Sequence, residues 1–393
     1  MIQKEHIEKH IGACRFVYNL FLEKKITHYT EHGKTLSCFA LNKILPDLKL
    51  EFPFLQEVHS QPLQMASRNL DNAFTRFFRE KKGFPKFKSK KNPLQSYQYP
   101  QGVKLHWDDK KVYLPKVGDV RCKFHQLFDG NIKTCTISRT STSKYFISIL
   151  VDDKKHVPEQ QPFTPDTTIG IDVGLKHFAT LSDGTKIDNP KFFVKSSRKL
   201  KKLQQSVSRK VIGSKNYQKS KLKVAKCHEI IANQRSDFLH KLSCKLVSEN
   251  QAIAIEDLNV LGMIKTRNLA KHITDVSWSE FRRQLEYKCK NFGKTLLVIG
   301  RFEPSSKICN HCGYHNNNLE LKDRIWVCPE CGYELDRDVN AAINIKKFAL
   351  LKQNTGQELP EEPVEIESDV VASCKNASIC ETGSHILKTS KKF

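Results

Sequence analysis

Four cysteines constrain the fold of this chain more than any other feature of its sequence. They form two C-x2-C pairs that fifteen residues separate: Cys309, Cys312, Cys328 and Cys331. A glycine follows each pair and permits the tight turn that points two thiolates the same way. Four thiolates complete a closed tetrahedral shell around Zn²⁺ with no open position, so the motif predicts a structural zinc ribbon. Four buried thiols or two disulfides are the alternative, but neither requires this paired spacing.

The charge of the chain indicates a class of partner. Its 393 residues include 66 Lys and Arg against 42 Asp and Glu, a formal net charge of +24. A charge of this size favours binding to a polyanion, with nucleic acid as the first hypothesis. The 39% apolar content is enough to form a core, which excludes a disordered basic tail. Because the sequence has no run of about 18 apolar residues and no signal-peptide core, we expect a cytoplasmic protein with reduced cysteines.

The apolar pattern changes along the chain and predicts a multidomain α+β protein. Helical spacing over roughly the first ninety residues predicts a small helical domain. Short β-rich runs over residues 103–151 predict an antiparallel meander or a small barrel. A polar, proline-rich linker at 156–167 precedes apolar strands that alternate with charged helices, as expected of an α/β domain. At 358–369, six acidic residues with no cation among them predict a disordered tail.

Three acidic sites stand at the ends of predicted elements. Asp172 is the one charge in the apolar strand TTIGIDVG, and Glu256 ends a second apolar strand. Asp336 and Asp338 precede a short helix predicted to begin near Asn340. A single acid at such a place is more often a helix cap or a loop anchor. Together, however, carboxylates from separate elements are what two-metal hydrolysis of a phosphodiester requires, and strand ends of an α/β sheet are where ligands bind. In a chain of charge +24, the pattern predicts a Mg²⁺-dependent nuclease.

Several motifs give the chain a specific resemblance. The motifs occur in the order ACRFVYNLFL, GFPKFKSKK, GIDVGLKHFATLSDG, NQRSDFLHKLS, AIAIEDLNVLG, PSSKICNHCG, CPECG and DRDVNAAINI. On these motifs, which cover roughly residues 5–348, the chain resembles the TnpB family of transposon-encoded RNA-guided nucleases, which are similar to the smallest type V CRISPR effectors.

The resemblance implies a domain order. A helical recognition domain would cover residues 1–92 and a β-barrel wedge domain residues 93–160. A RuvC-type, RNase H-like α/β nuclease domain would follow in two parts, at 161–304 and 335–350, with the zinc ribbon inserted at 305–334. Residues 351–393 would form the tail.

The resemblance also implies an acidic triad of Asp172, Glu256 and Asp338 as the catalytic Mg²⁺ ligands. Asp338 is preferred because it occupies the D-x-N-A-A position, and Asp336 stays a possible substitute. The sequence departs from the family at one end. Family members usually begin with a short strand of the wedge domain, whereas Met1 lies almost directly in the first helix. A missing strand is expected to weaken the barrel and DNA engagement and to leave the triad untouched.

Two basic segments are candidates for nucleic-acid binding, with an ordinary solvated face as the alternative. In the first, aromatic rings such as Phe84 and Phe87 interleave with the cations, and Tyr97 and Tyr99 follow. The predicted contacts there are Arg76, Arg79, Lys86, Lys88, Lys90 and Lys91. In the second, a cationic helix suits the backbone of a guide–target duplex. Its predicted contacts are Lys199, Lys201, Lys202, Arg209 and Lys210. For Arg235, Asp237 and His240, catalysis and buried polar packing both stay open.

The combined interpretation is a Mg²⁺-dependent, RNA-guided endodeoxyribonuclease of a transposon. A guide RNA from the transposon end would supply specificity, and double-stranded target DNA beside a short flanking motif would be cut. Zinc would be structural and Mg²⁺ catalytic, and the protein would associate with the nucleoid. An RNA-guided DNA-binding protein without cleavage and a DNA-strand-transfer transposase are the alternatives. The intact triad argues against the first, and the ribbon between the second and third carboxylates argues against the second.

Overall fold

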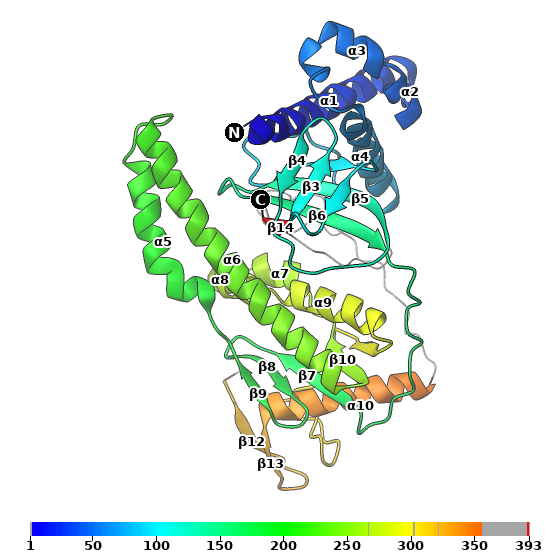
Figure 1. The fold of residues 1–393 in the computed structure, drawn as a ribbon. Helices are drawn as coiled ribbons and strands as arrows, with labels where there is room; N and C mark the ends of the chain where they lie inside the picture. Colours follow the sequence, from blue (N-terminus) through cyan, green and yellow to red (C-terminus); the bar gives the residue numbers. More distant parts are fainter. Residues whose placement is uncertain (1, 266, 302, 321, 356–390, 393) are drawn as a thin grey trace. The chain divides into compact units, whose positions relative to one another are not determined.

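The structure is a computed structural model that describes residues 2–265, 267–301, 303–320, 322–355 and 391–392 (Figure 1). Within these ranges the chain forms two compact units, 2–155 with 391–392, and 156–355. Both units contain helices and strands, which confirms a mixed α/β, multidomain fold. The acidic segment at 358–369, predicted to belong to a disordered tail, lies outside the described residues.

The first unit begins with a set of helices. They are α1 (Ile2–His32), α2 (Cys38–Lys43), α3 (Leu45–Glu51), a 3-10 turn (Pro53–Leu55) and α4 (Ser60–Arg79). The buried face of α1 includes Ile11, Val17 and Phe21, and that of α4 includes Leu63 and Leu70. These positions have the helical spacing read from the sequence, so the amphipathic pattern determines which face of each helix enters the core.

Two antiparallel sheets complete the first unit. One has the order β1-β5-β6-β14, formed by β1 (Gln95–Tyr99), β5 (Asn131–Arg139), β6 (Tyr145–Asp152) and β14 (Lys391–Lys392). The other consists of β2 (Lys104–His106), β3 (Lys111–Leu114) and β4 (Gly118–Arg121). The alternating burial along β6 is typical of a strand with one face on the core. The pairing of β14 with the outer edge of β6 was not predicted from the sequence.

Tyr97 and Tyr99 lie in β1 and belong to the core. We expected their rings to follow the first basic segment as base-stacking groups, but their side chains are 3% and 0% exposed. The Tyr99 hydroxyl donates to the carbonyl oxygen of Pro115 at 2.9 Å, and the Tyr97 ring stacks on His10. The expectation was wrong because the β region begins at Gln95, before the predicted start at residue 103.

The second unit is built on a five-stranded sheet of order β11-β10-β7-β8-β9. Its strands are β7 (Thr168–Val173), β8 (His177–Leu181), β9 (Lys186–Asp188), β10 (Ala252–Glu256) and β11 (Thr295–Ile299). β10 is parallel to both β7 and β11, whereas β7, β8 and β9 are successively antiparallel. Its helices are α5 (Phe192–Ser208), α6 (Lys215–Glu249), α7 (Val260–Lys265), α8 (Arg267–Val276), α9 (Trp278–Asn291) and α10 (Arg337–Thr355).

Helices cover both faces of this sheet, because alternate side chains of β10 pack against different helices. Ile253 and Ile255 pack in one core with residues of α6 and α9. Ala252 and Ala254 pack in a second core with residues of α10. Because successive side chains of a strand alternate between faces, the small residues mark the face that α10 approaches closely.

Gly170 of β7 makes this close approach possible. A Cβ atom at position 170 would lie 2.1 Å from the carbonyl oxygen of Ala342 in α10, which no real side chain tolerates. The glycine therefore allows the backbone of α10 to lie directly on β7. This contact brings the start of α10 to the end of the strand that carries Asp172.

A buried carboxylate anchors the helical hairpin of α5 and α6. Both oxygens of Asp275 accept from the backbone N–H of Phe193, at 3.1 and 3.0 Å, and Oδ1 also accepts from Arg235 Nη2 at 3.0 Å. Only 5% of the Asp275 side chain is exposed. Arg235 is thus a partner of a buried polar group, the structural alternative left open by the sequence.

None of the helices in the described ranges is long and apolar enough to span a bilayer.

Candidate active site and metal centre

Asp172 and Glu256 stand side by side at the carboxyl ends of two neighbouring parallel strands. Gly170 pairs with Ala254, and Ile171 pairs with Ile255, so the residues that follow are Asp172 and Glu256. Adjacent strands are about 4.8 Å apart. Asp172 shares the face of Gly170, and Glu256 shares the face of Ala254, by strand alternation. Both carboxylates therefore belong to the sheet face that α10 covers.

Asp338 joins them from α10. It lies in the first turn of that helix, and 22% of its side chain is exposed. Burial, followed by the negative charges of Asp338 and Glu256, raises the pKa of Asp172 to about 8. Burial and the charge of Asp257 raise the pKa of Glu256 to about 7. Asp338 of α10 and Glu256 of β10 are thus both near enough to Asp172 of β7 for their charges to act on its carboxyl group.

Asp336 has a different environment. Its Oδ1 accepts the backbone N–H groups of Asp338 and Val339, both at 3.1 Å, which caps the N-terminus of α10. Its Oδ2 accepts from Lys186 Nζ at 2.6 Å. Burial opposes ionisation, but these partners hold the pKa of Asp336 below its ordinary value. The contacts favour a capping role for Asp336, and Asp338 stays the predicted third ligand. The helix begins at Arg337 rather than near Asn340, so Asp338 lies inside it.

We expect the metal-free protein to lose stability between about pH 4 and pH 8. The folded-state pKa values of Asp172 and Glu256, about 8 and 7, lie above their ordinary values of 3.8 and 4.5. The folded chain therefore keeps protons that the unfolded chain has released, and their contribution is lost as the pH rises through 7 and 8. Mg²⁺ should offset the loss and raise the melting temperature more at pH 8 than at pH 6.

Thermal melting with and without Mg²⁺ at both pH values measures this effect. The double variant Asp172→Asn, Glu256→Gln lacks both titrating groups and should show a smaller pH dependence and little response to Mg²⁺. An equal Mg²⁺ response in the variant would contradict the assignment of these carboxylates.

Two arginines near the triad were missed by the sequence reasoning. Arg324 Nη1 lies 3.3 Å from Asp338 Oδ1, and the charges of Arg324 and Arg337 both favour the ionised form of Asp172. Arg324 precedes strand β12 (Ile325–Val327) of the ribbon. No local pattern could have identified it, because its proximity to Asp338 depends on how the ribbon folds back.

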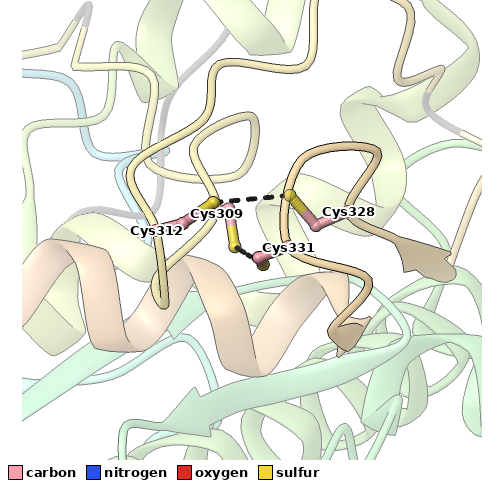
Figure 2. Close-up of side chains that lie close together, drawn as sticks. All are labelled: Cys309, Cys312, Cys328 and Cys331. Carbon is pink, nitrogen blue, oxygen red and sulfur yellow. Dashed lines mark hydrogen bonds between the residues drawn. The ribbon is translucent and has the colours of Figure 1, made fainter.

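The four cysteines meet as predicted. Their sulfur atoms all lie within 4.8 Å of one another, and within the described ranges no other group of three or more potential ligands is so compact. The Sγ atoms of Cys309 and Cys331 are 3.8 Å apart, and those of Cys312 and Cys328 are 3.5 Å apart (Figure 2). A tetrahedral Zn²⁺ with bonds of about 2.3 Å separates its sulfurs by about 3.8 Å. The cluster is therefore compatible with a structural zinc ion.

The turns of this centre confirm the role predicted for its glycines. Gly313 has φ +83° and Gly332 has φ +72°, a conformation that favours glycine. In each turn the glycine N–H donates to the carbonyl of the first cysteine of the pair, Cys309 or Cys328. The second turn joins β12 to β13 (Glu334–Asp336).

Two buried asparagines connect the ribbon to α10. Asn340 Nδ2 donates to the carbonyl of Ile308 at 2.7 Å, and its Oδ1 accepts from the N–H of Asn310 at 2.9 Å. Asn344 Nδ2 donates to the carbonyls of Ser305 and Ile308 at 2.8 and 2.6 Å. The asparagine of D-x-N-A-A thus fixes the ribbon against the helix that carries Asp338.

The predicted contacts of both basic segments are exposed, apart from the half-buried Arg76. In the second, all of the predicted contacts are exposed, and Lys199, Lys201 and Lys202 lie on α5. In the first, Phe84 and Phe87 are exposed beside the cations. Lys88, however, places its Nζ 4.1 Å from the centroid of the Tyr18 ring, and burial of the ammonium lowers the pKa of Lys88. Its backbone is also held by the Asn19 amide, so the structure gives Lys88 an intramolecular role.

Family models match three parts of the chain. One described as "Probable transposase" matches residues 147–267, and one described as "Cas12f1-like, TNB domain" matches residues 278–345. A third, described as "Helix-turn-helix domain", matches residues 2–34, where the structure has the single helix α1 and the start of the following loop.

Comparisons with individual proteins cover nearly the whole chain. "Putative RNA-guided DNA endonuclease" of Streptomyces pristinaespiralis is 39% identical over 361 residues, which are 90% of this chain and 88% of the relative. "Putative RNA-guided DNA endonuclease InsQ" of Escherichia coli (strain K12) is 34% identical over 93% of this chain and 95% of the relative.

A solved structure has a similar fold. It is the cryo-EM structure of a Cas12f1–sgRNA–target DNA complex, with a TM-score of 0.52 and 16% identity over 87% of this chain and 82% of that one. At this identity the likeness concerns the fold alone. The two curated relatives, in contrast, share at least 34% of their residues with this chain over most of their length, so the protein belongs to the TnpB family.

Proposed function

We propose that the protein is a Mg²⁺-dependent, RNA-guided DNA endonuclease. The observation that carries the proposal is the convergence of Asp172, Glu256 and Asp338 at one edge of the sheet in a chain of net charge +24. The names of two relatives that are 39% and 34% identical support the guided cleavage of DNA.

In this proposal the second unit is a RuvC-type nuclease domain with an inserted zinc ribbon. Its mixed sheet carries two of the carboxylates, and the ribbon stands between the second and third. In the first unit, the helices correspond to the proposed recognition domain and the two sheets to the proposed wedge domain. A single nuclease site would cut the two DNA strands in turn.

In this proposal the three carboxylates hold a divalent metal. Hard oxygen ligands suit Mg²⁺. Burial and then neighbouring negative charge raise the pKa values of Asp172 and Glu256, and a bound cation would favour their ionised forms. The chemistry that bound Mg²⁺ supplies is activation of a water for in-line attack and stabilisation of the leaving oxygen. The chain itself positions the ligands. Gly170 allows α10 to lie directly on β7, and Asp336 caps that helix. Arg282 and Arg301 bind Asp257, the residue that follows Glu256.

The second basic segment should contact phosphates. Reversing Lys201, Lys202 and Arg209 to Glu should weaken nucleic-acid binding and flatten its salt dependence. Each lost contact lowers the magnitude of the log–log slope by about 0.9 on duplex DNA and about 0.7 on single strands. Binding isotherms over a salt series measure the slope. Reversal of Lys43, Lys245 and Lys290, also exposed, makes the same change in net charge elsewhere and should alter the slope less. Equal slopes for the two variants would place α5 away from the nucleic acid.

Co-purification tests the proposed function as a whole. The protein is expressed with its own locus and purified, and the RNA that accompanies it is sequenced. A single bound RNA from the transposon end, followed by Mg²⁺-dependent cutting of a plasmid library beside a short motif, is the expected result. Bound RNA with target binding but uncut DNA would favour the guided binder, and joined DNA strands would favour the transposase.

A further inference from the structure

The turn between α5 and α6 presents two adjacent apolar side chains to solvent. Val211 is 80% exposed and Ile212 is 84% exposed, the two highest values among the large apolar residues of the described ranges. Branched apolar side chains at a helix–helix turn gain nothing from such exposure. The side chains of this pair, called here the apolar tip, therefore add little buried apolar area to the hairpin.

The backbone of this turn is well defined. The N–H of Ser214 donates to the carbonyl of Val211 at 3.1 Å, and Gly213 adopts φ +88°. The hydroxyl of Ser214 caps α6 by accepting from the N–H of Tyr217 at 3.1 Å. Because the turn is closed by hydrogen bonds and a helix cap, the apolar tip is held outward by a structured turn.

The hairpin behind the tip is fixed to the rest of the second unit. α5 and α6 run side by side, and their turn lies at the end away from the sheet (Figure 1). Leu200, Cys227 and Ile231 form a small core between the helices, and Asp275 holds the start of α5. The apolar tip is thus the end of an anchored arm.

The positive charge around the apolar tip indicates which class of partner the tip contacts. Between Lys186 and Lys226 the sequence has fourteen Lys or Arg and one acid, Asp188, and exposed Arg209 and Lys210 immediately precede the tip. A second copy of the chain would bring two such cationic arms together and be repelled. Two side chains are also too small an apolar area to anchor a protein in a lipid surface by themselves. A nucleic-acid duplex offers both phosphates for the cations and base faces for the apolar tip.

We propose that Val211 and Ile212 act as an apolar wedge that packs against the base pairs of a duplex whose phosphates the α5–α6 hairpin contacts. The inference rests on the proposed function and names one contact of the nucleic acid. Apolar wedges that partly unstack base steps are used by proteins that deform duplexes, at a cost of a few kcal/mol per step that additional contacts offset. Here those contacts are the cations on both sides of the turn.

The test uses the full chain and an RNA–DNA duplex with 2-aminopurine placed at successive steps and at the ends. The wild-type protein should increase the fluorescence at one position, because 2-aminopurine brightens when it is unstacked. The double variant Val211→Ser, Ile212→Ser should lose that increase and bind severalfold more weakly, with an unchanged salt slope because every cation remains. Leu50→Ser, which changes a 76% exposed residue of α3, should behave as wild type.

The outcomes separate the inference from the proposed function. Wild-type protein that binds the duplex and cuts guided targets without any fluorescence change would overturn the wedge and leave the nuclease in place. Wild-type protein that binds no duplex at all would overturn both. A double variant that instead loses self-association or binding to anionic vesicles would assign the apolar tip to another partner and overturn the wedge.

Discussion

Replacing Asp172 or Glu256 with Ala should abolish DNA cleavage and leave guide-RNA and target binding nearly intact. Each change removes a proposed metal ligand and no phosphate contact. Loss of a group that merely supports a ligand typically costs 10- to 100-fold, so loss of the ligand itself should exceed about 100-fold. Single-turnover cleavage with preformed complexes measures the rate, and filter binding measures the affinity.

The alanine variants of Asp336 and Asp338 can be compared in the same assays. Asp338→Ala should behave like Asp172→Ala. Asp336→Ala removes the cap of α10 and the partner of Lys186, so it should cost about 1 kcal/mol of stability and reduce cleavage far less. The reverse ranking would make Asp336 the third ligand. Residual cutting by both the Asp172 and Glu256 variants would remove the whole triad from the mechanism.

Replacing Cys309 and Cys328 with Ser should release one zinc ion per chain and unfold the ribbon. Metal binding to such modules is coupled to their folding, with apparent free energies of about 10–16 kcal/mol for zinc-finger peptides. The effect should reach the nuclease site, because an unfolded ribbon leaves the buried amides of Asn340 and Asn344 without their partners. Asp338, two residues before Asn340 in the same helix, should then lose its position.

Elemental analysis of the purified protein measures the zinc, and cleavage at saturating Mg²⁺ measures the consequence. Cys244→Ser, outside the ribbon and exposed, is the control and should keep both metal and activity. Wild-type protein without zinc would mean that the four thiols are merely buried. Full cleavage by the zinc-free variant would mean that the ribbon does not position Asp338.

Features within single elements could be predicted from the sequence. The continuous apolar runs before Asp172 and Glu256 are typical of strands buried on both faces, and the structure has the two residues in β7 and β10. The spacing of the cysteines and the glycine after each pair predicted both turns of the ribbon. In these cases the information is local, because periodicity and backbone conformation depend on neighbouring residues.

Tyr97 and Tyr99 show where local information fails. They follow a basic segment, as the rings of a nucleic-acid surface would, yet both lie in the core. An aromatic side chain suits a core or the face of a base about equally well. Only the path of the neighbouring chain segments decides which of these it contacts.

By itself, then, the sequence determined the zinc motif, the buried strands that carry two carboxylates, the helical faces and the class of partner. The tertiary structure distinguished the environments of Asp336 and Asp338, since the two acids share one sequence context but only Asp336 caps α10 and binds Lys186. It also placed Arg324 beside Asp338 and α10 on Gly170. The physical reason is the same in each case: these contacts join residues far apart in the chain, and their geometry depends on how complete elements pack.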